Sequence, residues 1–476
     1  MGGKIHGMLD VGKRSLANSQ TALQTVGHNI ANKSTEGYSR QRVEIQSNLP
    51  IGSDGKVRVG MGAKASNITR INNPHLEKQI GKEQSNLGFL NGKMDALSRV
   101  EQVFNEQVNK GLNHFMGDFF NSMRELANNP ESHATRSLVK ETANYLTKDF
   151  KRVNNQLKEI QKDIDFQITT QVNEVNQMAQ EVANLNEKIQ MVEINGSNAN
   201  DERDRRDLLV KKIGEKININ HAEGKDGTVT IRAGNTGILV AGTDFKKLSV
   251  QETPESDKKG EGNVDVFYHN SDRSTPVKMT GQINGGSIGG LLEVRDQEIG
   301  GLLNDTDELA YTLATQVNEA HRFGVDGTNK FGYTFFDQPT QVRHASEQLK
   351  VNQDIMDNPA RIASAAAQSS PGDNRVANFI SNLQFEKVMG NGNTMDDFYN
   401  GIVGKVGVTT QRADLAQKSQ SDILKNLNNI RESVSGVSLD EETTKMIEFQ
   451  KGFDASARLI RTADEMFDTV LNLKRM

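Results

Sequence analysis

Two residue types are absent from this sequence, cysteine and tryptophan, and aromatic residues make up only 5% of its 476 positions. Without cysteine the chain can form neither a disulfide framework nor a thiolate metal site. Its nine histidines show no His-x-x-x-His or His-Glu-x-x-His spacing, so we predict no metal site and no cofactor. Because aromatic side chains are scarce, the core must be built mainly from aliphatic residues, methionine and alanine.

Long apolar runs are also missing, and the charges nearly balance. No stretch approaches the roughly 18 consecutive apolar residues that a membrane-spanning helix requires, so we expect no membrane span. The opening residues Met1–His6 lack the apolar region of a secretory signal peptide, so an exported chain would need another route. A net charge of -5 gives no electrostatic reason to expect a nucleic-acid partner.

Glycine and proline are unevenly distributed, and the intervals without them indicate long helices. No glycine occurs between Gly117 and Gly196, and no proline between Pro130 and Pro254. Within this interval apolar residues recur in steps of three and four over 146–192, which predicts a helical rod on the order of 70 Å long. Further helices are predicted over residues 74–128, 302–321 and 395–435.

Between residues 216 and 285 the apolar period changes from that of helices to that of strands. Six short β-type runs alternate there with turn sequences. We predict a small antiparallel β domain inserted into the helical chain, with Thr253–Gly262 as its most flexible loop. A separate short pair of strands is predicted near the N-terminus, at Arg42–Gln46 and Lys56–Val59.

Both ends of the chain carry an apolar repeat of seven residues. The N-terminal repeat consists of Leu9, Leu16, Leu23 and Ile30. The C-terminal repeat, within residues 439–473, consists of Leu439, Met446, Phe453, Ile460 and Phe467, with Phe449, Ala463 and Val470 in a second row. Such a heptad pattern is typical of a helix that buries one stripe against a partner helix. We predict that the two ends pair and that these residues form an assembly seam; two unrelated amphipathic helices are the alternative.

The N-terminal repeat runs into a short polar motif. Its residues are Asn29, Ile30, Ala31, Asn32, Thr35, Gly37 and Tyr38. This motif resembles the N-terminal signature of bacterial flagellar rod, hook and hook-associated proteins, the axial family of the flagellum. The continuation Ser39-Arg40-Gln41 and the ending from Ser435 onward are similar to hook-associated members at the hook–filament junction. Glu36 is a departure, since these proteins commonly carry proline there.

Two further stretches bear on binding or catalysis. Asn200–Leu208 is rich in charge and also resembles the junction proteins; on its residues alone we predict a solvated, salt-bridged turn, with a cation site as the less favoured alternative. Gly285–Gly289 fits the Gly-x-Ser-x-Gly pattern of a hydrolase nucleophile, but the strand–helix alternation of that fold is missing around it. We therefore predict no catalytic residues and no enzyme.

These features together predict a mainly α protein with an inserted β domain. The resemblance implies that the terminal segments, residues 1–70 and 436–476, form the inner-tube assembly domain as long coiled-coil helices. Residues 71–215 and 286–435, from both halves of the chain, are expected to form a helical-bundle rod domain, with residues 216–285 as the small antiparallel β domain.

The resemblance further implies a structural subunit that joins the hook to the filament and is needed for filament assembly. Its expected partners are further copies of the chain in a ring, the hook protein on one side and the next hook-associated protein on the other. It also implies type III export to an extracellular position in the flagellum, with an export chaperone holding the C-terminal region beforehand. The alternatives are a hook or distal rod protein of the same family, and a secreted coiled-coil adhesin or effector.

Overall fold

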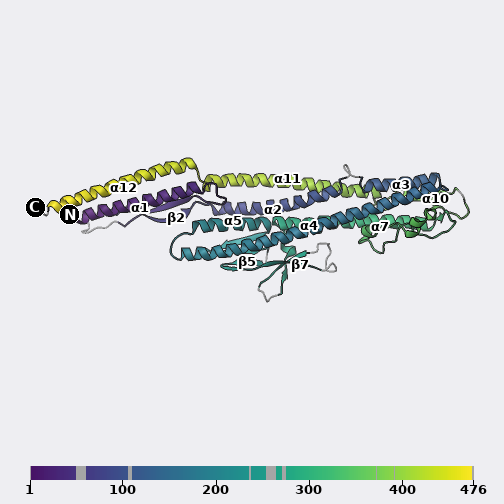
Figure 1. The fold of residues 1–476 in the computed structure, drawn as a ribbon, viewed down its shortest axis with the longest axis horizontal. Helices are drawn as coiled ribbons and strands as arrows, with labels where there is room; N and C mark the ends of the chain where they lie inside the picture. Colours follow the sequence, from purple (N-terminus) through teal and green to yellow (C-terminus); the bar gives the residue numbers. More distant parts are fainter. Residues whose placement is uncertain are drawn as a thin grey trace.

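The computed structural model shows the chain as a long helical rod. It describes residues 2–49, 60–105, 110–234, 237–253, 264–270, 275–370, 372–390 and 392–473. Both termini lie at one end of the rod, and helices α3 (Leu112–Asn128), α7 (Gly300–Arg322) and α10 (Arg375–Asn382) lie toward the other (Figure 1). The predicted fold class, mainly α with a small antiparallel insertion, is confirmed.

Helix α4 is the longest element of the rod. It runs from His133 to Glu193, 61 residues, which is about 90 Å at 1.5 Å per residue and longer than the sequence predicted. Ser132 caps it by accepting a hydrogen bond from the N–H of Thr135. Besides α3, α7 and α10, the helices include α1 (Gly2–Ala31), α2 (Pro74–Val103), α5 (Asn200–Lys216), α11 (Met395–Ser435) and α12 (Leu439–Leu473).

The prediction of one continuous helix over residues 74–128 is wrong. Helix α2 ends at Val103, and α3 begins only at Leu112. Just after α2, Phe104 is buried in the core, with its ring 6.5 Å from that of Tyr399. The helix therefore ends where the side chain of Phe104 packs against α11, about 300 residues away in the sequence. The local apolar pattern does not reveal this end.

The inserted β domain packs on α4 and contains two antiparallel sheets. The first has the order β3-β4-β5-β6 and the second the order β7-β8-β9. The strands are β3 (Ile219–Glu223), β4 (Val229–Ala233), β5 (Gly237–Ala241), β6 (Asp244–Phe245), β7 (Leu248–Glu252), β8 (Val264–Tyr268) and β9 (Val277–Lys278). Apart from Thr253, the predicted flexible loop Thr253–Gly262 lies outside the described residues.

A two-stranded sheet follows α1. Strand β1 (Gln41–Ser47) pairs antiparallel with β2 (Ala63–Arg70), with Val43 opposite Ile68. The strand predicted at Lys56–Val59 lies outside the described residues. The sequence did not predict β2, because Ile68 is its one large apolar residue and supplies no alternating pattern.

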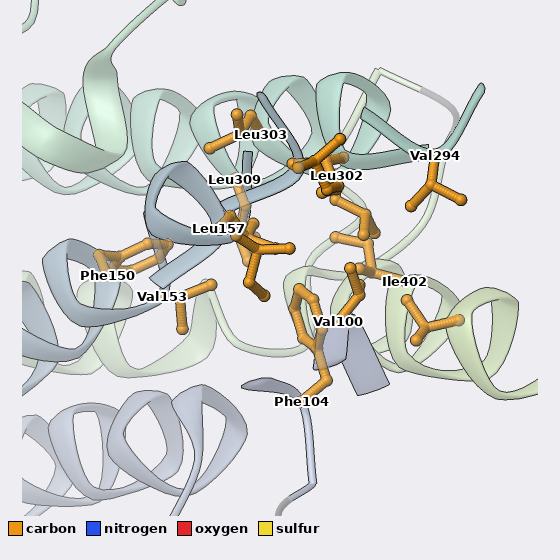
Figure 2. Close-up of a cluster of buried hydrophobic side chains, with 14 of the residues drawn as sticks. Val100, Phe104, Phe150, Val153, Leu157, Val294, Leu302, Leu303, Leu309 and Ile402 are labelled. Carbon is orange, nitrogen blue, oxygen red and sulfur yellow. The ribbon is translucent and has the colours of Figure 1, made fainter. Parts of the chain in front are cut away.

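One hydrophobic core joins the two halves of the chain across the insert. Figure 2 shows a part of it in which α2, α4, α7 and α11 converge. The side chains there include Val100, Phe104, Phe150, Val153, Leu157, Leu302, Leu309 and Ile402. Because segments from both sides of the insert share this core, the rod is complete only when the C-terminal half of the chain is present.

Buried asparagines fasten other segments to the helices by a repeated arrangement. In each case the side-chain amide donates to the carbonyl and accepts from the N–H of one residue. The pairs are Asn176 with Leu248, Asn186 with Val229, and Asn318 with Phe336, at 2.8–3.0 Å. An amide side chain matches a peptide unit in donors and acceptors, so the buried polar groups on both sides are satisfied. The first two pairs bond each sheet of the insert to α4.

Glycines bring α6 (Gly286–Glu293) into backbone contact with α2. A methyl group on Gly290 would collide with the carbonyl oxygen of Phe89, and a methyl group on Gly92 would collide with that of Ser287. Close packing of α6 on α2 therefore explains Gly290, whereas Gly286 has a φ of +68° and lies against the backbone of Lys216 and Ile217.

Replacing Gly290 with alanine is expected to destabilise the rod by about 1–3 kcal/mol, because the backbones of α6 and α2 must separate to admit the methyl group. Gly301→Ala in α7 is a matched control. Its added methyl group meets only the ammonium nitrogen of Lys405, at 3.9 Å, so the higher helix propensity of alanine should raise stability. Urea unfolding followed by circular dichroism measures both changes. Equal stability of the two variants would contradict the packing argument.

His321 is fully buried near the end of α7. Its Nδ1 lies 2.9 Å from the carbonyl oxygen of Tyr333, and its Nε2 lies 2.8 Å from the backbone nitrogen of Ala363. The ring therefore donates from Nδ1 and accepts at Nε2, which requires the neutral form. Burial lowers the pKa of His321 to about 4.

We expect acid to destabilise the rod through His321. The unfolded chain binds a proton near pH 6.5 and the folded chain only near pH 4, so stability that is present above pH 6.5 is lost as the pH falls toward 4. The loss approaches about 3 kcal/mol at the lower pH. Unfolding free energies of His321→Gln, measured from neutral pH to pH 4, should lack this component. An identical pH dependence in both proteins would refute it.

Candidate assembly interface

The two ends of the chain lie side by side as an antiparallel pair of helices, α1 and α12, which we call the terminal pair (Figure 1). Near the middle of the pair the hydroxyl oxygens of Ser15 and Ser456 are 2.7 Å apart. At the end next to the rod, the side chain of Asn29 donates to Glu442 at 2.9 Å. Residue numbers that increase along α1 therefore face residue numbers that decrease along α12, so the two helices are antiparallel.

Small residues form the line of closest approach between the two helices. They are Gly12, Ser15, Ser19 and Ala22 on α1, and Gly452, Ser456 and Ala463 on α12. A methyl group on Gly12 would lie 2.8 Å from Cγ1 of Ile460, and one on Gly452 would lie 3.2 Å from the hydroxyl oxygen of Ser19. Sequence reasoning placed only Ala463 of this line in the seam, because the other small residues contribute little to a hydrophobic pattern, although their seven-residue spacing was available.

The large residues of the predicted seam lie beside this line. They are Leu9, Leu16, Leu23, Ile30, Met446, Phe453, Ile460 and Phe467, all of them half-buried. Leu16 directly follows Ser15 and Phe453 directly follows Gly452, so both rows occupy the same flanking heptad position. In an antiparallel coiled coil these positions fall on one side of the pair. The eight residues therefore form one apolar strip, which we call the flanking band.

The other predicted seam residues belong to the C-terminal helix. Phe449 and Val470 are half-buried and share the heptad row of Ser456, which lies at the contact between the helices. Leu439, at the start of α12, is 40% exposed.

Asn29 connects α1, strand β1 and α12. Its side chain donates to the carbonyl of Gln41 at 2.9 Å and accepts from the N–H of Gln41 at 3.0 Å, the arrangement already seen in the rod. The same amide donates to Glu442 and accepts from the hydroxyl of Tyr38 at 2.8 Å. Burial raises the pKa of Tyr38, which keeps its hydroxyl a donor. One signature residue thus joins α1 and β1 to the start of α12, 413 positions further along the chain.

The remaining signature residues shape the end of α1. Asn32 donates to the carbonyl of His28 at 3.0 Å and accepts from the hydroxyl of Thr35 at 3.3 Å. Ile30 is half-buried as part of the flanking band, and Ala31 is exposed. Asn32 and Thr35 therefore have a local role in ending the helix.

Two contacts attach the turn after α1 to helix α5. Gly37 has a φ of +82°, a conformation that glycine adopts without strain, and a methyl group there would lie 3.1 Å from Cβ of Leu208. Glu36, the residue that departs from the family's proline, forms an ion pair with Lys212 at 3.0 Å.

Arg40 attaches the same turn to the start of α12. Its Nε and one terminal nitrogen lie 2.8 and 2.6 Å from Oε1 of Glu442, and its other terminal nitrogen lies 2.8 Å from Glu441. Its backbone N–H donates to the carbonyl of Ser435, at the end of α11. Because Glu442 is only 1% exposed, Arg40 supplies the charge that its carboxylate needs.

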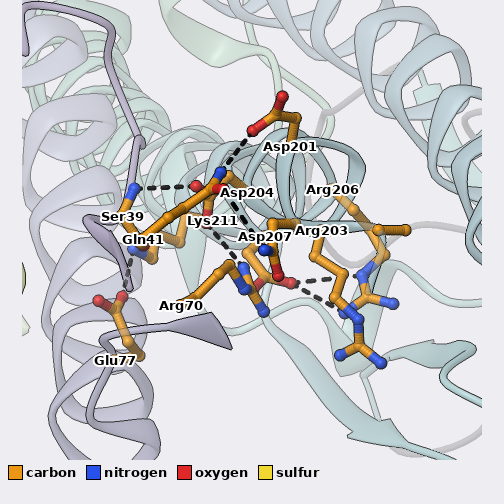
Figure 3. Close-up of polar contacts among 12 residues, drawn as sticks. Ser39, Gln41, Arg70, Glu77, Asp201, Arg203, Asp204, Arg206, Asp207 and Lys211 are labelled. Atoms are coloured by element: carbon orange, nitrogen blue, oxygen red, sulfur yellow. Dashed lines mark hydrogen bonds and ion pairs between the residues drawn. The ribbon is translucent and has the colours of Figure 1, made fainter. Parts of the chain in front are cut away.

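The charged stretch Asn200–Leu208 is salt-bridged, as the sequence predicted, but it is the start of a helix and not a solvated turn. It forms the first half of α5, and its carboxylates face the chain that leaves α1 (Figure 3). Asp204 accepts from the N–H of Ser39 at 2.8 Å, and Asp201 accepts from the side-chain amide of Gln41 at 2.7 Å. Sequence reasoning could not find these partners, because they lie about 160 residues away.

Two arginines complete the pairing around these carboxylates. Arg70, at the end of β2, lies 2.7 Å from Asp204 and 3.0 Å from Asp207. Burial opposes its charge, but the carboxylates of Asp207 and Asp204 raise the pKa of Arg70. Arg206 is buried and donates to the carbonyl of Gly227 in the insert. We call the meeting point of residues 29–41, 200–208 and 435–442 the joint.

The residues considered above for catalysis or metal binding make contacts that support the fold. The hydroxyl of Ser287, in the Gly-x-Ser-x-Gly sequence, donates to Gln171 of α4 at a contact between helices. Among the described residues no three His, Asp or Glu side chains gather closely enough to hold a metal ion. In the same part of the chain, no helix is both long and apolar enough to cross a membrane.

A family model described as the C-terminal part of flagellar basal body rod FlgEFG proteins matches residues 432–473, which contain α12. Terminal helices paired at one end of a helical rod, together with this match, define an axial protein of the bacterial flagellum. A second model, the helical domain of flagellar hook-associated protein FlgK, matches residues 97–336, just over half of the chain. The chain belongs to the FlgK family, whose members are structural proteins of the hook–filament junction.

Similar proteins span the whole chain. Flagellar hook-associated protein 1 of Bacillus subtilis is 29% identical, with 98% of this chain and 97% of that protein covered. The protein of the same name from Salmonella typhimurium is 24% identical, with 96% and 98% covered. The solved flagellar hook junction protein FlgK from Burkholderia pseudomallei shares the fold, with a TM-score of 0.67 at 14% identity over 75% of this chain and 100% of that one.

Proposed function

We propose that this chain joins the hook to the filament by polymerising into a ring through its terminal pair. The flanking band is the observation that carries the proposal. Leu16, Leu23, Phe453 and Ile460 are only half-buried within one chain, so the described residues leave an apolar strip about four heptads long partly open to solvent. An extended apolar strip of this kind marks an interaction surface.

The composition of the intrachain seam explains why the band is left partly open to solvent. Small residues such as Gly12, Ser15 and Ser456 let α1 and α12 approach closely, so the larger side chains are displaced to one flank. A neighbouring pair can insert its own flanking side chains between them, as knobs enter holes. Burial of apolar surface at about 25 cal/mol per Å² then favours assembly.

The same surface bears on export and on the neighbouring proteins. We propose that an export chaperone covers the C-terminal part of the band before assembly, and that the chain then passes through the flagellar type III channel. Because the chain has no cysteine, no disulfide has to form after export. In the ring, the hook protein lies on one side and the next hook-associated protein on the other.

A gene deletion and antibody labelling test the proposal. The deletion strain is expected to carry hooks without filaments and to shed filament protein into the medium. Gold-labelled antibody against the β domain should mark one band at the hook–filament boundary in the parent strain and nothing in the deletion strain. Labelling along the whole hook would favour a hook or rod protein. Labelling over the cell surface would favour an adhesin, and either result would overturn the proposal.

A further inference from the structure

Helix α11 packs on the rod by one narrow face over its C-terminal half. The contacts on that face include Gln417 with Asn91 at 2.7 Å and Gln420 with Glu83 at 2.6 Å, both on α2. Leu427 is buried on the same face. The rest of the helix circumference faces away from α2.

A row of large apolar side chains lies on the outward part of α11. It consists of Val408, Leu415, Ile423, Ile430 and Val434, which are each 44–60% exposed. Their spacing of seven, eight, seven and four residues places them on one side of the helix, about 40 Å long, and roughly 100° away from the buried face. We call this row the α11 stripe. Scattered single apolar residues are ordinary on a surface, but an aligned row of five marks a contact.

We propose that the α11 stripe is a lateral contact between copies of this chain, and that it packs against the outward face of α4 around Phe166 in the next copy. This inference rests on the proposed ring. Copies arranged around an axis must meet by two different surfaces, because a heterologous contact repeats from one copy to the next until the ring closes.

The α11 stripe lies on the helix that directly precedes α12, one of the two helices of the flanking band. Figure 1 shows α11 and α12 in succession along one edge, and Gly436–Ser438 alone separate them. A helix face about 40 Å long and 10 Å wide offers roughly 400 Å², about half of the 800 Å² that each partner contributes to a typical stable interface. In the proposed ring the flanking band supplies the remainder, because the two surfaces belong to consecutive helices.

The outward face of α4 suits the opposite side of this contact. Phe166 is 74% exposed, and the outward positions that follow it carry no charge: Thr170, Asn173, Gln177, Gln180 and Asn184. The carboxylates beside this row, Asp163, Glu174 and Glu181, already pair with Arg99, Lys216 and Arg205 of the same chain. A neighbour that covers the row therefore leaves each of these three carboxylates with its own cation.

The two surfaces also lie at the same height along the rod. Gln167, next to Phe166, bonds Asp95 of α2 at 3.5 Å, and Asn91, one turn away on α2, bonds Gln417 of α11. Copies standing side by side would thus bring the α11 stripe of one level with the α4 face of the next.

The absence of cysteine permits a direct test. Single-cysteine variants Ile423→Cys, Phe453→Cys and Lys425→Cys are labelled with benzophenone maleimide, added to hooks from a strain that lacks the chain, and irradiated after assembly. We expect the label at residue 423 to join two copies, with mass spectrometry placing the bond between residues 166 and 184 of the second copy. Lys425 is exposed on the other side of α11, so its label should give no such product.

The outcomes separate this inference from the proposed function. Crosslinks between copies from residue 453 but not from 423 would overturn the α11 contact and leave the ring in place. No crosslink between copies from either position would overturn the ring itself. A crosslink from residue 423 to hook protein, filament protein or a chaperone would show that this protein, and not a second copy of the chain, covers the α11 stripe. Such a result would overturn the inference.

A matched pair of substitutions gives a second measurement. Ile423→Glu is expected to weaken association between copies by about tenfold or more, since it places a carboxylate in the contact, while thermal unfolding of the monomer stays unchanged. Lys425→Glu introduces the same residue two positions away and should assemble normally. Equal assembly of the two variants would contradict the inference.

Discussion

Phe453→Asp is expected to abolish filament growth without unfolding the rod. Phe453 lies in the flanking band, where the proposed neighbour would bury it, and an unpaired carboxylate in that position resists removal from water. We expect the affinity between copies to fall at least about a hundredfold, or ~3 kcal/mol. Motility and electron microscopy of the variant strain measure the effect. Circular dichroism of the purified chain should show unaltered helix content, because the rod core does not include α12.

Ala455→Asp is the matched control for this experiment. Ala455 is exposed on the same helix, only two residues away, but on the opposite flank of the intrachain seam. It should support normal filaments. If both variants assemble, the flanking band is not an assembly surface; if both fail, the two flanks of α12 are equally needed.

Arg40→Leu is expected to open the joint. The substitution removes the cation from Glu442, which is buried, and leaves Asn29 as the donor to its carboxylate. Breaking a buried ion pair by removing one partner costs about 3–5 kcal/mol. Since the bonds of Arg40 hold α12 to the turn after α1, the loss should appear as local unfolding of the terminal pair. Hydrogen exchange resolved by segment would measure it, with α4 unaffected.

A second substitution separates the charge from packing. In Arg40→Leu combined with Glu442→Gln, no charge remains buried, and the glutamine can still accept the hydrogen bond from Asn29. Most of the lost protection should therefore return. If the double variant exchanges as fast as Arg40→Leu alone, the loss comes from the packing of the arginine side chain and not from the stranded carboxylate.

The hydrogen bonds at the joint also explain why the stretches that resemble the flagellar family lie so far apart in the sequence. The segment Asn29–Gln41 bonds to both the start of α5 and the start of α12. A change in one block leaves buried polar groups unpaired in another. The resemblance found at the two ends and in the middle of the sequence thus corresponds to one place in the structure.

The sequence by itself determined the helical ends, the long central helix and the position of the β insertion. The bounds of α11 and α12 agree with the prediction from the sequence. These features depend on local physics: apolar periodicity, helix caps, and the distribution of glycine and proline. The motif at residues 29–38 was sufficient to indicate the axial family.

The tertiary structure decided which faces of those helices meet. A seven-residue period shows that a stripe exists, but rows of large and small residues share that period, and only packing selects the row at the contact. At the terminal pair the small row was selected, since Gly12 and Gly452 permit a close approach that Leu16 or Phe453 would prevent. The partners of Arg40, Asp204 and the buried asparagines were decided in the same way, because bonds between residues hundreds of positions apart leave no periodic trace in the sequence.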